Sequence, residues 1–503
     1  MQMHPKLQEL KTRLAEVNDL NEANAVLSWD QMTFMPPGGA EARGRQIATL
    51  ERLSHEKFTD PEIGKLLDEL QPVVPELAPD SPDVALIRVT THDYQKAVKV
   101  PPVFTAELSE HTSKTYSAWT KARAEKNFKL VAPLLEKTLD LSRQLANFYP
   151  GYQHIADPLI DDLDEGMTVA VIRPLFQKLR TELTPLIQKI TSQAAPDDSC
   201  LRREFPEEEQ LKFGLEVARK MGYDFNRGRQ DKSPHPFTTS FSIGDVRITT
   251  RVKTNFLAEA LFSTIHESGH ALYEQGINPD FDGLPLASGT SMSVHESQSR
   301  LWENLVGRSR TFWQYFYPQL QAIFPSQLRD VQSEDFYRAI NKVERSLIRT
   351  DADEVTYNLH VMIRFDLELE MLEGKLPVKD LPEAWNNRYF KDLGVIPTDD
   401  SVGVLQDMHW YSGTIGGYFQ SYTLGNILSA QFFDAAIRAY PSIPSEIAAG
   451  TFDHLHNWLR EHIYKYGREY RAAEIITGAT GRPLELESYL KYLHSKYSEL
   501  YQL

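Results

Sequence analysis

The sequence predicts a mainly helical protein that carries one small β-hairpin. Along most of the chain, apolar residues recur at three- and four-residue spacing, which is the period of an amphipathic helix. Residues 235–252 are different, because Thr, Phe, Val and Ile alternate there around the sequence Ile243-Gly244-Asp245. Alternation interrupted by a turn is typical of two paired strands. The expected fold class is therefore mainly α, with one short β-hairpin.

Helices are expected over most of the N-terminal half of the chain. The stretches with helical period cover residues 3–27, 40–70, 82–98, 102–126, 127–148, 169–194 and 206–221. Residues 36–39, Pro-Pro-Gly-Gly, separate the first two stretches. The helices expected over residues 82–98, 102–126 and 127–148 are separated near Pro101, Pro102 and Pro133. Proline is tolerated near the start of a helix and breaks its interior.

The two strands of the hairpin are placed near residues 236–242 and 245–252. A lone hairpin is only marginally stable in water, so this one is expected to pack on helices. A small sheet in a helical protein can present an exposed edge to which a peptide adds as a further strand. A plain connecting ribbon is the alternative.

Helices are expected again after the hairpin. The helical period covers residues 255–275, 294–318, 334–374, 416–439, 445–463 and 484–499. Gly276 suits the C-cap of the first of these helices. In the tract 334–374, Thr350-x-x-Asp353 has the spacing of a capping box. Two helices that meet near residue 350 are therefore the alternative to one long helix.

The composition is that of an ordinary soluble globular protein. Of the 503 residues, 41% are hydrophobic and 25% are charged. The length fits roughly two to four domains or subdomains, although no sharp linker separates them. The formal net charge is −16. Because nonspecific affinity for nucleic acid comes from clustered Lys and Arg, this charge argues against a nucleic-acid partner.

A cytoplasmic location is the expectation from cysteine usage and from the N-terminus. Cys200 is the one cysteine, so the fold does not depend on an internal disulfide. Residues 1–6 lack the basic start and apolar run of a signal peptide. No apolar stretch approaches the ~20 residues that a membrane span requires, so no membrane association is expected.

Residues 266–270, His-Glu-Ser-Gly-His, form an H-E-x-x-H motif within the expected helix 255–275. Residues four apart lie on one face of a helix, so the imidazoles of His266 and His270 can bind one zinc ion at about 2.0–2.1 Å. Glu267 can then reach a water on the metal and act as its general base. The alternative is a pair of core histidines that flank a buried glutamate, but such a glutamate is costly without a cation.

A catalytic zinc site usually has three protein ligands and one open position, so a third ligand should come from another element. Residues 295–300, His-Glu-Ser-Gln-Ser-Arg, begin the next expected helix. Glu296 would give the His₂Glu set that suits hydrolytic zinc, whereas His295 is the competitor and would give His₃. The third histidine of the metzincins is absent, because Gly276 stands at its position.

Six short motifs follow one another along the chain. They read His235-Pro236-Phe237, Asp245-Val246-Arg247-Ile248-Thr249, His266-Glu267-Ser268-Gly269-His270, His295-Glu296-Ser297-Gln298, Ile348-Arg349-Thr350-Asp351-Ala352-Asp353 and Gly403-Val404-Leu405-Gln406-Asp407-Met408-His409-Trp410. Together they resemble, nearly from end to end, the Taq-like thermostable metallocarboxypeptidases, a family of zinc H-E-x-x-H carboxypeptidases.

The resemblance implies a closed, mostly helical zinc-peptidase fold with a deep active-site groove. In that fold residues 1–503 form a single catalytic unit of two lobes around the groove. Residues 1–60 would wall the groove, the hairpin 235–252 would line it, and residues 255–300 would carry the metal. Family members are usually homodimers that remove single amino acids from the free C-terminus of peptides with broad side-chain tolerance.

The resemblance also implies the roles of the metal site. It assigns His266, His270 and Glu296 as ligands, which removes most of the case for His295, and it leaves Glu267 as the general base. Zinc is the expected metal, although a His₂Glu site also accepts cobalt or manganese.

Further residues are expected to contact the substrate. The spacing of His409 and Tyr418 resembles that of the oxyanion-binding His and Tyr of distantly related dipeptidyl carboxypeptidases, and Tyr422, one turn further on, is the alternative to Tyr418. Arg349 is the candidate for the terminal carboxylate, because a planar guanidinium pairs with that group bidentately. An ion pair between Arg349 and Asp351 or Asp353 is the alternative.

The hairpin offers two further substrate-binding candidates, Arg247 and His235. A structural role at the strand entrance is an equally good interpretation of His235. Two rival functions also remain. A zinc oligoendopeptidase of similar fold would ignore the C-terminus of its substrate, and a non-catalytic peptide-binding helical scaffold belongs to a different class. Retention of Glu267 and the ligands argues against the scaffold.

Overall fold

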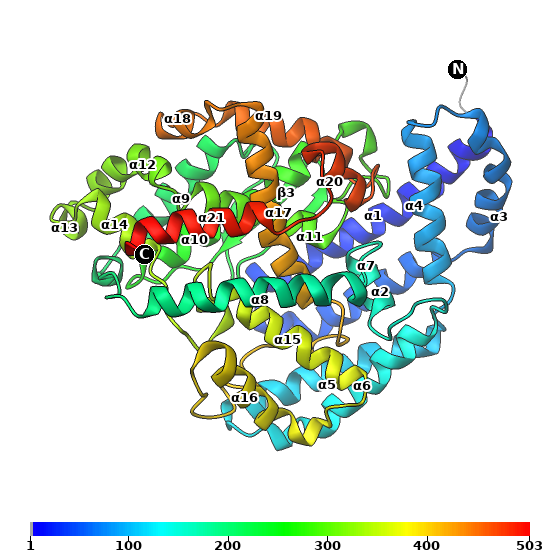
Figure 1. Ribbon diagram of the computed structural model, residues 1–503. Helices are drawn as coiled ribbons and strands as arrows, with labels where there is room; N and C mark the ends of the chain where they lie inside the picture. The colour runs from blue at the N-terminus through cyan, green and yellow to red at the C-terminus, as the bar shows by residue number, and fades with distance from the viewer. Residues whose placement is uncertain (1–3) are drawn as a thin grey trace. The chain divides into compact units, whose positions relative to one another are not determined.

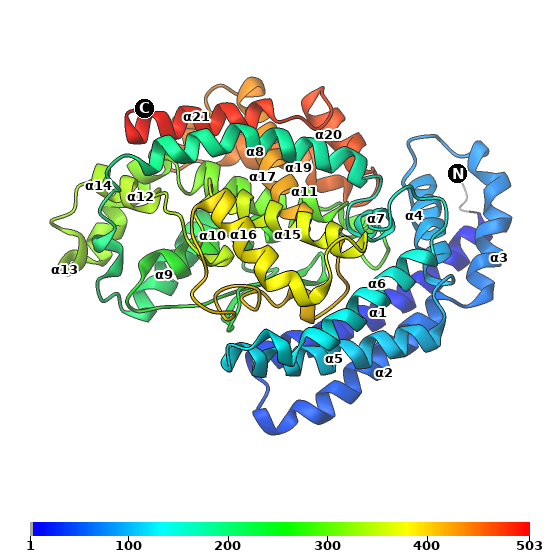
Figure 2. The same cartoon turned by 60° about the horizontal axis from the view of Figure 1, so that its bottom comes forward.

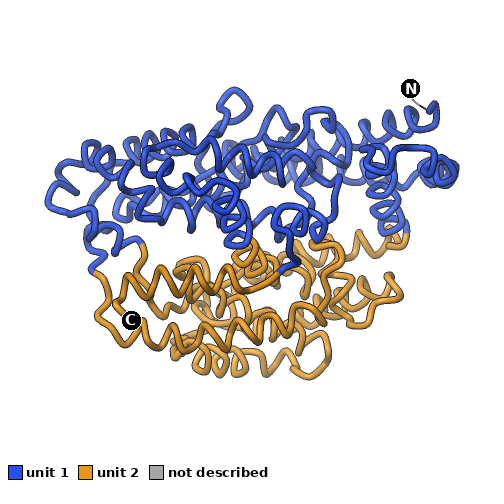
Figure 3. Tube along the Cα trace, turned by 45° about the horizontal axis from the view of Figure 1, so that its top comes forward, with its two compact units in different colours: residues 1–98, 197–340, 429–484 blue, residues 99–196, 341–428, 485–503 orange. Residues whose placement is uncertain are grey.

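The computed structural model describes residues 4–503, which divide into two compact units (Figure 3). Unit 1 extends from the N-terminal segment to Val98 and adds Asp197–Ile340 and Ser429–Leu484. Unit 2 comprises Lys99–Pro196, Asn341–Leu428 and Glu485–Leu503. Position 3 of the helix expected over residues 3–27 lies outside the described residues, and the helix is described from Pro5 to Thr33.

Four helices open unit 1: α1 (Pro5–Thr33), α2 (Ala40–Phe58), α3 (Pro61–Leu70) and α4 (Pro82–Ala97). Helices α1 and α2 run side by side (Figure 2). The prediction of one helix over residues 40–70 is wrong, because Pro61 cannot continue a helix from the preceding turn. Asp60 instead caps α3, and its carboxylate accepts the N–H of Glu62 at 2.9 Å.

The sheet of unit 1 has three strands: β1 (Gln230–Lys232), β2 (Thr238–Ser242) and β3 (Asp245–Thr250). Their order is β1-β3-β2, with β2 and β3 antiparallel and β1 parallel to β3. The hairpin thus confirms the expected β element, whereas β1 was not predicted. The hairpin packs on α10 (Leu257–Gly276), and Trp29 of α1 meets Phe241 edge-on at 6.3 Å.

The other helices of unit 1 are α9 (Glu207–Met221), α10, α11 (Met292–Arg300), α12 (Arg310–Ile323), α13 (Pro325–Leu328), α14 (Ser333–Ile340), α18 (Ile443–Ala448), α19 (Asp453–His462) and α20 (Ala472–Thr480). The single helix expected over 294–318 is wrong, because a π-helical turn at Leu301–Val306 separates α11 from α12. The helix expected over 445–463 divides at Gly450, whose φ of +75° does not fit a right-handed helix.

Unit 2 contains α5 (Pro102–Ala124), α6 (Ala132–Asn147), α7 (Asp157–Leu163), α8 (Val169–Thr191), α15 (Tyr357–Leu372), α16 (Leu381–Leu393) and α21 (Glu487–Tyr501). Helix α17 (Phe419–Ala439) begins in unit 2 and ends in unit 1. Helices α8 and α21 are distant in sequence but lie side by side in Figures 1 and 2. Helices α7, α16 and α20 were not predicted; α7 and α20 are short, with 7 and 9 residues.

The long helix expected over 334–374 is interrupted between Ile340 and Tyr357. A short 3₁₀ turn at Arg349–Asp351 lies in the gap. Asp353 opens α15, since its carboxylate accepts the N–H groups of Val355 and Thr356 at 2.9 and 3.0 Å. The alternative of two helices is therefore the correct one, with a connection of irregular backbone between them. Within residues 4–503, no helix combines the length and apolarity of a bilayer span.

Candidate metal centre

The H-E-x-x-H motif lies in the C-terminal half of α10. The rings of His266 and His270 are neighbours on this helix, with centroids 5.0 Å apart. Apolar residues of the same helix, such as Ile265 and Leu272, are buried in unit 1 and fix its orientation. The helix therefore presents the two imidazoles from a rigid support.

Gly269, the last residue before His270, lets α11 approach α10 very closely. A Cβ at Gly269 would lie 2.7 Å from the carbonyl oxygen of Gln298 and 2.7 Å from Cα of Ser299. Only glycine fits there without moving one backbone from the other. Helix α11 is itself fixed at its start, because the Ser291 hydroxyl accepts the N–H of Val294 at 3.2 Å. This close packing brings Glu296 beside the histidines.

His266, His270 and Glu296 form the group of side chains in residues 4–503 that could hold a metal ion, with ligand atoms all within 4.8 Å of one another. Oε2 of Glu296 lies 3.4 Å from Nε2 of His270 and 3.8 Å from Nε2 of His266. Ligand atoms at 2.0–2.1 Å from a tetrahedral zinc are about 3.3 Å apart. Donor type and spacing therefore both fit a single divalent ion of the zinc class.

A carboxylate from the π-helical turn holds the first histidine. Nδ1 of His266 lies 2.9 Å from Oε2 of Glu303, which leaves Nε2 for the metal. Glu303 is in turn paired with Arg300 at 3.3 Å and with Arg308 at 3.2 Å. Metal-binding histidines commonly donate their second N–H to such a carboxylate, which fixes both tautomer and ring orientation.

The second histidine is held through another histidine. Nδ1 of His270 lies 2.6 Å from Nδ1 of His295, and Nε2 of His295 lies 2.7 Å from Oε1 of Glu274. One consistent set of protons satisfies this chain: His270 donates to His295, and His295 donates to Glu274. Both ring nitrogens of His295 are therefore engaged, and Glu296 is the residue that completes the ligand group.

Charge around the site follows from burial and these pairings. Burial opposes ionisation of Glu303, but His266, Arg300 and Arg308 outweigh it and lower the pKa of Glu303 to about 2. Burial likewise opposes the charge on Glu296, yet Arg300 and the histidines hold its pKa well below the usual range. Burial lowers the pKa of His270 to about 3. His270 is thus held neutral and Glu296 ionised, the forms that bind a cation, whereas burial opposes the charge of His266 but Glu296 and Glu303 outweigh it and raise its pKa.

Thr238 on strand β2 contacts Glu267, and no local sequence pattern indicates this contact. Its hydroxyl lies 2.6 Å from Oε2 of Glu267, a side chain that is buried. Burial raises the pKa of Glu267, an effect that His266 and this hydrogen bond oppose. Glu274 and Glu303 were missed as well, because nothing in their local sequence marks them as partners of the motif.

Unit 2 brings Arg349, His409 and Tyr422 together around Asp407. One carboxylate oxygen of Asp407 accepts from Nε of Arg349 at 2.6 Å, and the other is hydrogen-bonded to Nδ1 of His409. Nε2 of His409 lies 3.2 Å from the hydroxyl of Tyr422. Arg349 is thus paired with Asp407, whereas the sequence had offered Asp351 and Asp353 as its alternative partners.

Tyr418 also lies at this cluster, with its ring centroid 5.0 Å from that of His409. Its side chain is exposed, whereas Tyr422 is partly buried. Burial disfavours the charge of Arg349, but Asp407 outweighs it and raises the pKa of the guanidinium further. Arg349 therefore carries a permanent positive charge inside unit 2.

The two candidates on the hairpin lie in unit 1. Arg247 pairs with Asp245 through two hydrogen bonds of 2.7 and 2.8 Å, and its guanidinium lies 4.4 Å from the ring centre of Trp29. His235 is exposed just before β2, and its carbonyl oxygen accepts from the Ser233 hydroxyl at 2.6 Å.

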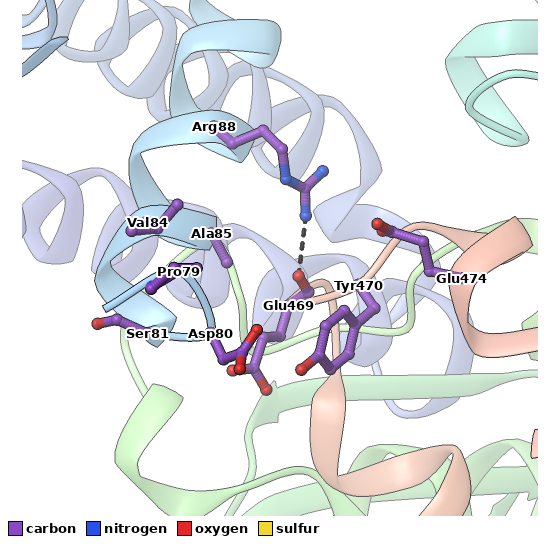
Figure 4. Close-up of a pocket in the computed structure, with 9 residues that line it drawn as sticks. All are labelled: Pro79, Asp80, Ser81, Val84, Ala85, Arg88, Glu469, Tyr470 and Glu474. Carbon is purple, nitrogen blue, oxygen red and sulfur yellow. Dashed lines mark hydrogen bonds between the residues drawn. The ribbon is translucent and has the colours of Figure 1, made fainter. Parts of the chain in front are cut away.

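A separate pocket of unit 1 lies between the start of α4 and the segment before α20 (Figure 4). The polar ends of Asp80, Glu469 and Tyr470 gather in it, while Arg88 donates to the carbonyl oxygen of Glu469 at 2.9 Å. None of the metal-site residues lines this pocket. This pocket is therefore separate from the metal centre.

Comparison with known proteins identifies this arrangement. The family model described as carboxypeptidase Taq (M32) metallopeptidase matches residues 9–497. The chain belongs to the M32 carboxypeptidase Taq family. It is 40% identical to thermostable carboxypeptidase 1 of Thermus thermophilus, with 96% of each chain covered. It is 35% identical to carboxypeptidase 1 of Bacillus subtilis over the full length of both.

A solved structure gives the same result for the fold. The crystal structure of an M32 carboxypeptidase from Deinococcus radiodurans superposes with a TM-score of 0.97 and 49% identity, covering 99% of this chain and 100% of that one. The family resemblance and the mainly helical fold expected from the sequence are thus confirmed. As an M32 family member the chain is a metallocarboxypeptidase, and its mechanism requires a divalent metal.

Proposed function

We propose that the chain is a zinc carboxypeptidase that removes single amino acids from the free C-terminus of peptides, with broad side-chain tolerance. The observation that supports it most is the convergence of His266, His270 and Glu296 on one point, next to the buried Glu267. A His₂Glu set suits hydrolytic zinc, although cobalt or manganese would also fit these donors.

Glu267 serves as the general base and then as the general acid. The chemistry supplied by bound zinc is polarisation of the scissile carbonyl and acidification of the attacking water. Glu267 takes a proton from that water and later passes it to the nitrogen of the leaving amino acid. Burial favours this exchange, because it brings the pKa of the carboxyl group closer to neutrality than that of an exposed glutamate.

His409 and a tyrosine stabilise the oxyanion of the tetrahedral substrate. Asp407 fixes His409 through Nδ1, so that Nε2 is the atom available to a partner. Tyr422 lies within hydrogen-bond range of that nitrogen, and this contact favours it as the partner of His409. The exposure of Tyr418 favours a contact of its hydroxyl with substrate. Both tyrosines therefore remain candidates, with complementary roles.

Arg349 binds the carboxylate at the substrate C-terminus. Asp407 and Tyr357 accept two of the five N–H donors of this guanidinium, at 2.6 and 3.0 Å. These contacts hold the group in one orientation, which is the condition for bidentate recognition of a carboxylate. Because Asp407 contacts both Arg349 and His409, one residue orients the two groups.

The hairpin supplies a surface for the peptide backbone. Strand β2 is at the edge of the sheet, and an extended peptide can add to such an edge through main-chain hydrogen bonds. His235, exposed at the entrance to this strand, is positioned to contact the peptide, whereas the pairing of Arg247 with Asp245 supports mainly a structural role.

The substrate proposal is tested with two peptides that differ only at the C-terminus, one a free acid and one an amide. We expect stepwise loss of single residues from the acid and resistance of the amide. Equal cleavage of both would instead support the zinc oligoendopeptidase of similar fold. Dialysis against a chelator should abolish the activity, and zinc should restore it. Activity indifferent to the chelator would contradict the metal mechanism.

We further propose that the protein acts in the cytoplasm as a homodimer. The single cysteine, Cys200, is buried, and burial raises the pKa of its thiol to about 11, which suits a reducing compartment. Light scattering on the purified chain tests the dimer, and a mass near that of one chain would contradict it.

A further inference from the structure

The general base is hydrogen-bonded by a residue outside every motif that carries the family resemblance. Oγ1 of Thr238 lies 2.6 Å from Oε2 of Glu267 and 3.0 Å from the carbonyl oxygen of the same residue. Thr238 is the first residue of β2, and Glu267 lies in α10, so the contact joins the sheet to the metal-binding helix within unit 1. Only 6% of the Glu267 surface is exposed, so water competes little for this contact.

Thr238 is held in place by the strands around it. It pairs with Ile248 of β3, a residue with no exposed surface. The preceding residue, Phe237, is fixed at both backbone atoms: its N–H donates to the hydroxyl of Thr249 at 2.9 Å, and its carbonyl oxygen accepts the N–H of Thr249 at 2.9 Å. Thr249 is fully buried and also accepts from Ser233 at 2.8 Å. The Thr238 hydroxyl is therefore presented by rigid structure.

We propose that Thr238 is the positioning residue of the general base. This inference rests on the proposed role of Glu267. The Thr238 hydroxyl fixes Oε2, so the other carboxylate oxygen, Oε1, is the one that receives the proton of the attacking water. Without Thr238 the Glu267 side chain can rotate away from the water, and misplacement by a fraction of an ångström is costly in a proton transfer.

A hydroxyl suits this position because it can donate to Oε2 whether or not Oε1 carries a proton. While Glu267 is ionised, Thr238 donates to Oε2. After Oε1 has taken the proton, Oε2 is still an acceptor and keeps the same hydrogen bond. The proton received from water then passes to the leaving amine. Glu267 thus keeps a partner in both of its states.

The test compares Thr238→Val, Thr238→Ser and the control Thr181→Val. Valine keeps the shape and removes the hydroxyl, whereas serine keeps the hydroxyl. Thr181 lies on α8 in unit 2, and its exposed hydroxyl donates to the carbonyl oxygen of Gln177 at 2.9 Å. We measure kcat and KM on a free-acid peptide, together with bound zinc. Thr238→Val should lower kcat roughly 10- to 100-fold with KM and zinc content unchanged, the range for a hydrogen bond to a charged group.

Thr238→Ser and Thr181→Val should stay within about threefold of the wild type. A kcat of Thr238→Val within threefold of the wild type would overturn the proposal, as would equal losses in the Ser and Val variants. Loss of zinc from Thr238→Val would also contradict it, since a residue that positions the base leaves the metal ligands in place.

A double variant separates this inference from the function on which it rests. If Thr238 acts through Glu267, adding Thr238→Val to Glu267→Gln causes no further loss. A further tenfold loss in that background would overturn the positioning role. If Glu267→Gln by itself retains full activity, the proposed role of Glu267 as general base is wrong. The kcat of this single variant therefore tests the general base independently of Thr238.

Discussion

Replacement of Gly289 by alanine should weaken metal binding without removing any polar group from the metal centre. A Cβ on Gly289 would lie 2.6 Å from Cδ2 of His295 and 3.0 Å from Cε1 of Tyr273. Ordinary contact begins at 3.4 Å, so the His295 ring must move by about 0.8 Å. The backbone at Gly289 is tied in place, because its N–H donates to Glu274 at 3.1 Å.

The expected loss follows from the bond between the two histidines. Nδ1 of His270 and Nδ1 of His295 are 2.6 Å apart, and a shift of 0.8 Å can lengthen this contact to about 3.4 Å, beyond the usual length of such a hydrogen bond. Loss of such an outer partner of a metal ligand typically costs 10- to 100-fold in metal affinity, or roughly 1.4–2.7 kcal/mol. We therefore expect a Kd for zinc that is higher by that factor.

The assay titrates zinc into the metal-free protein in competition with a chelator of known affinity. Gly44→Ala is the matched control, because a Cβ at Gly44 in α2 meets nothing within 4 Å. The reasoning is refuted if Gly289→Ala binds zinc within threefold of the wild type. It is also refuted if Gly44→Ala shows the same loss, since the effect would then have no connection with His295.

Three further predictions concern Glu267, Arg349 and Glu368. Glu267→Gln should lose about 10²–10⁴ in kcat and keep its metal, measured by kinetics and elemental analysis; loss of metal would contradict its role as base. Arg349→Lys should raise KM for free-acid peptides roughly 10- to 100-fold, and an effect on kcat alone would contradict carboxylate binding. Burial raises the pKa of Glu368 from 4.5 to about 8. Because the folded state binds this proton more tightly than the unfolded chain, the free energy of unfolding should fall as pH rises between these values, by up to about 1.4 kcal/mol per pH unit. Glu368→Gln should flatten this slope in urea unfolding, and an unchanged slope would refute the assignment.

The sequence predicted those parts of the protein that depend on local periodicity. His266 and His270 are brought together by the pitch of one helix, so their spacing alone is enough to place both on one face. The hairpin could also be predicted from the sequence, because alternation of side-chain types around Gly244 is a local signal. From its place at the start of the next helix Glu296 was one of two candidates, and the family resemblance favoured it over His295. Its approach to the histidines depends on the missing side chain of Gly269.

Other features have no local signal. Strand β1 is three residues long and pairs in parallel with β3, which requires knowledge of the tertiary fold. Arg349 pairs with Asp407, 58 residues further on, and not with the acidic residues of its own motif. The capping-box spacing at Thr350 indicated a junction in this tract, but the length of the break between Ile340 and Tyr357 was not predicted, because apolar spacing continues through irregular backbone. Contacts such as that between Thr238 and Glu267 are likewise decided by packing and not by propensity.

The central claim is that one zinc ion is held by His266, His270 and Glu296. It is tested most directly by anomalous diffraction from a crystal of the zinc-loaded protein, with data on both sides of the zinc absorption edge. We predict a single peak about 2.0–2.2 Å from Nε2 of both histidines and from a carboxylate oxygen of Glu296. A peak bound by His295, or no zinc peak at this position, would contradict the account.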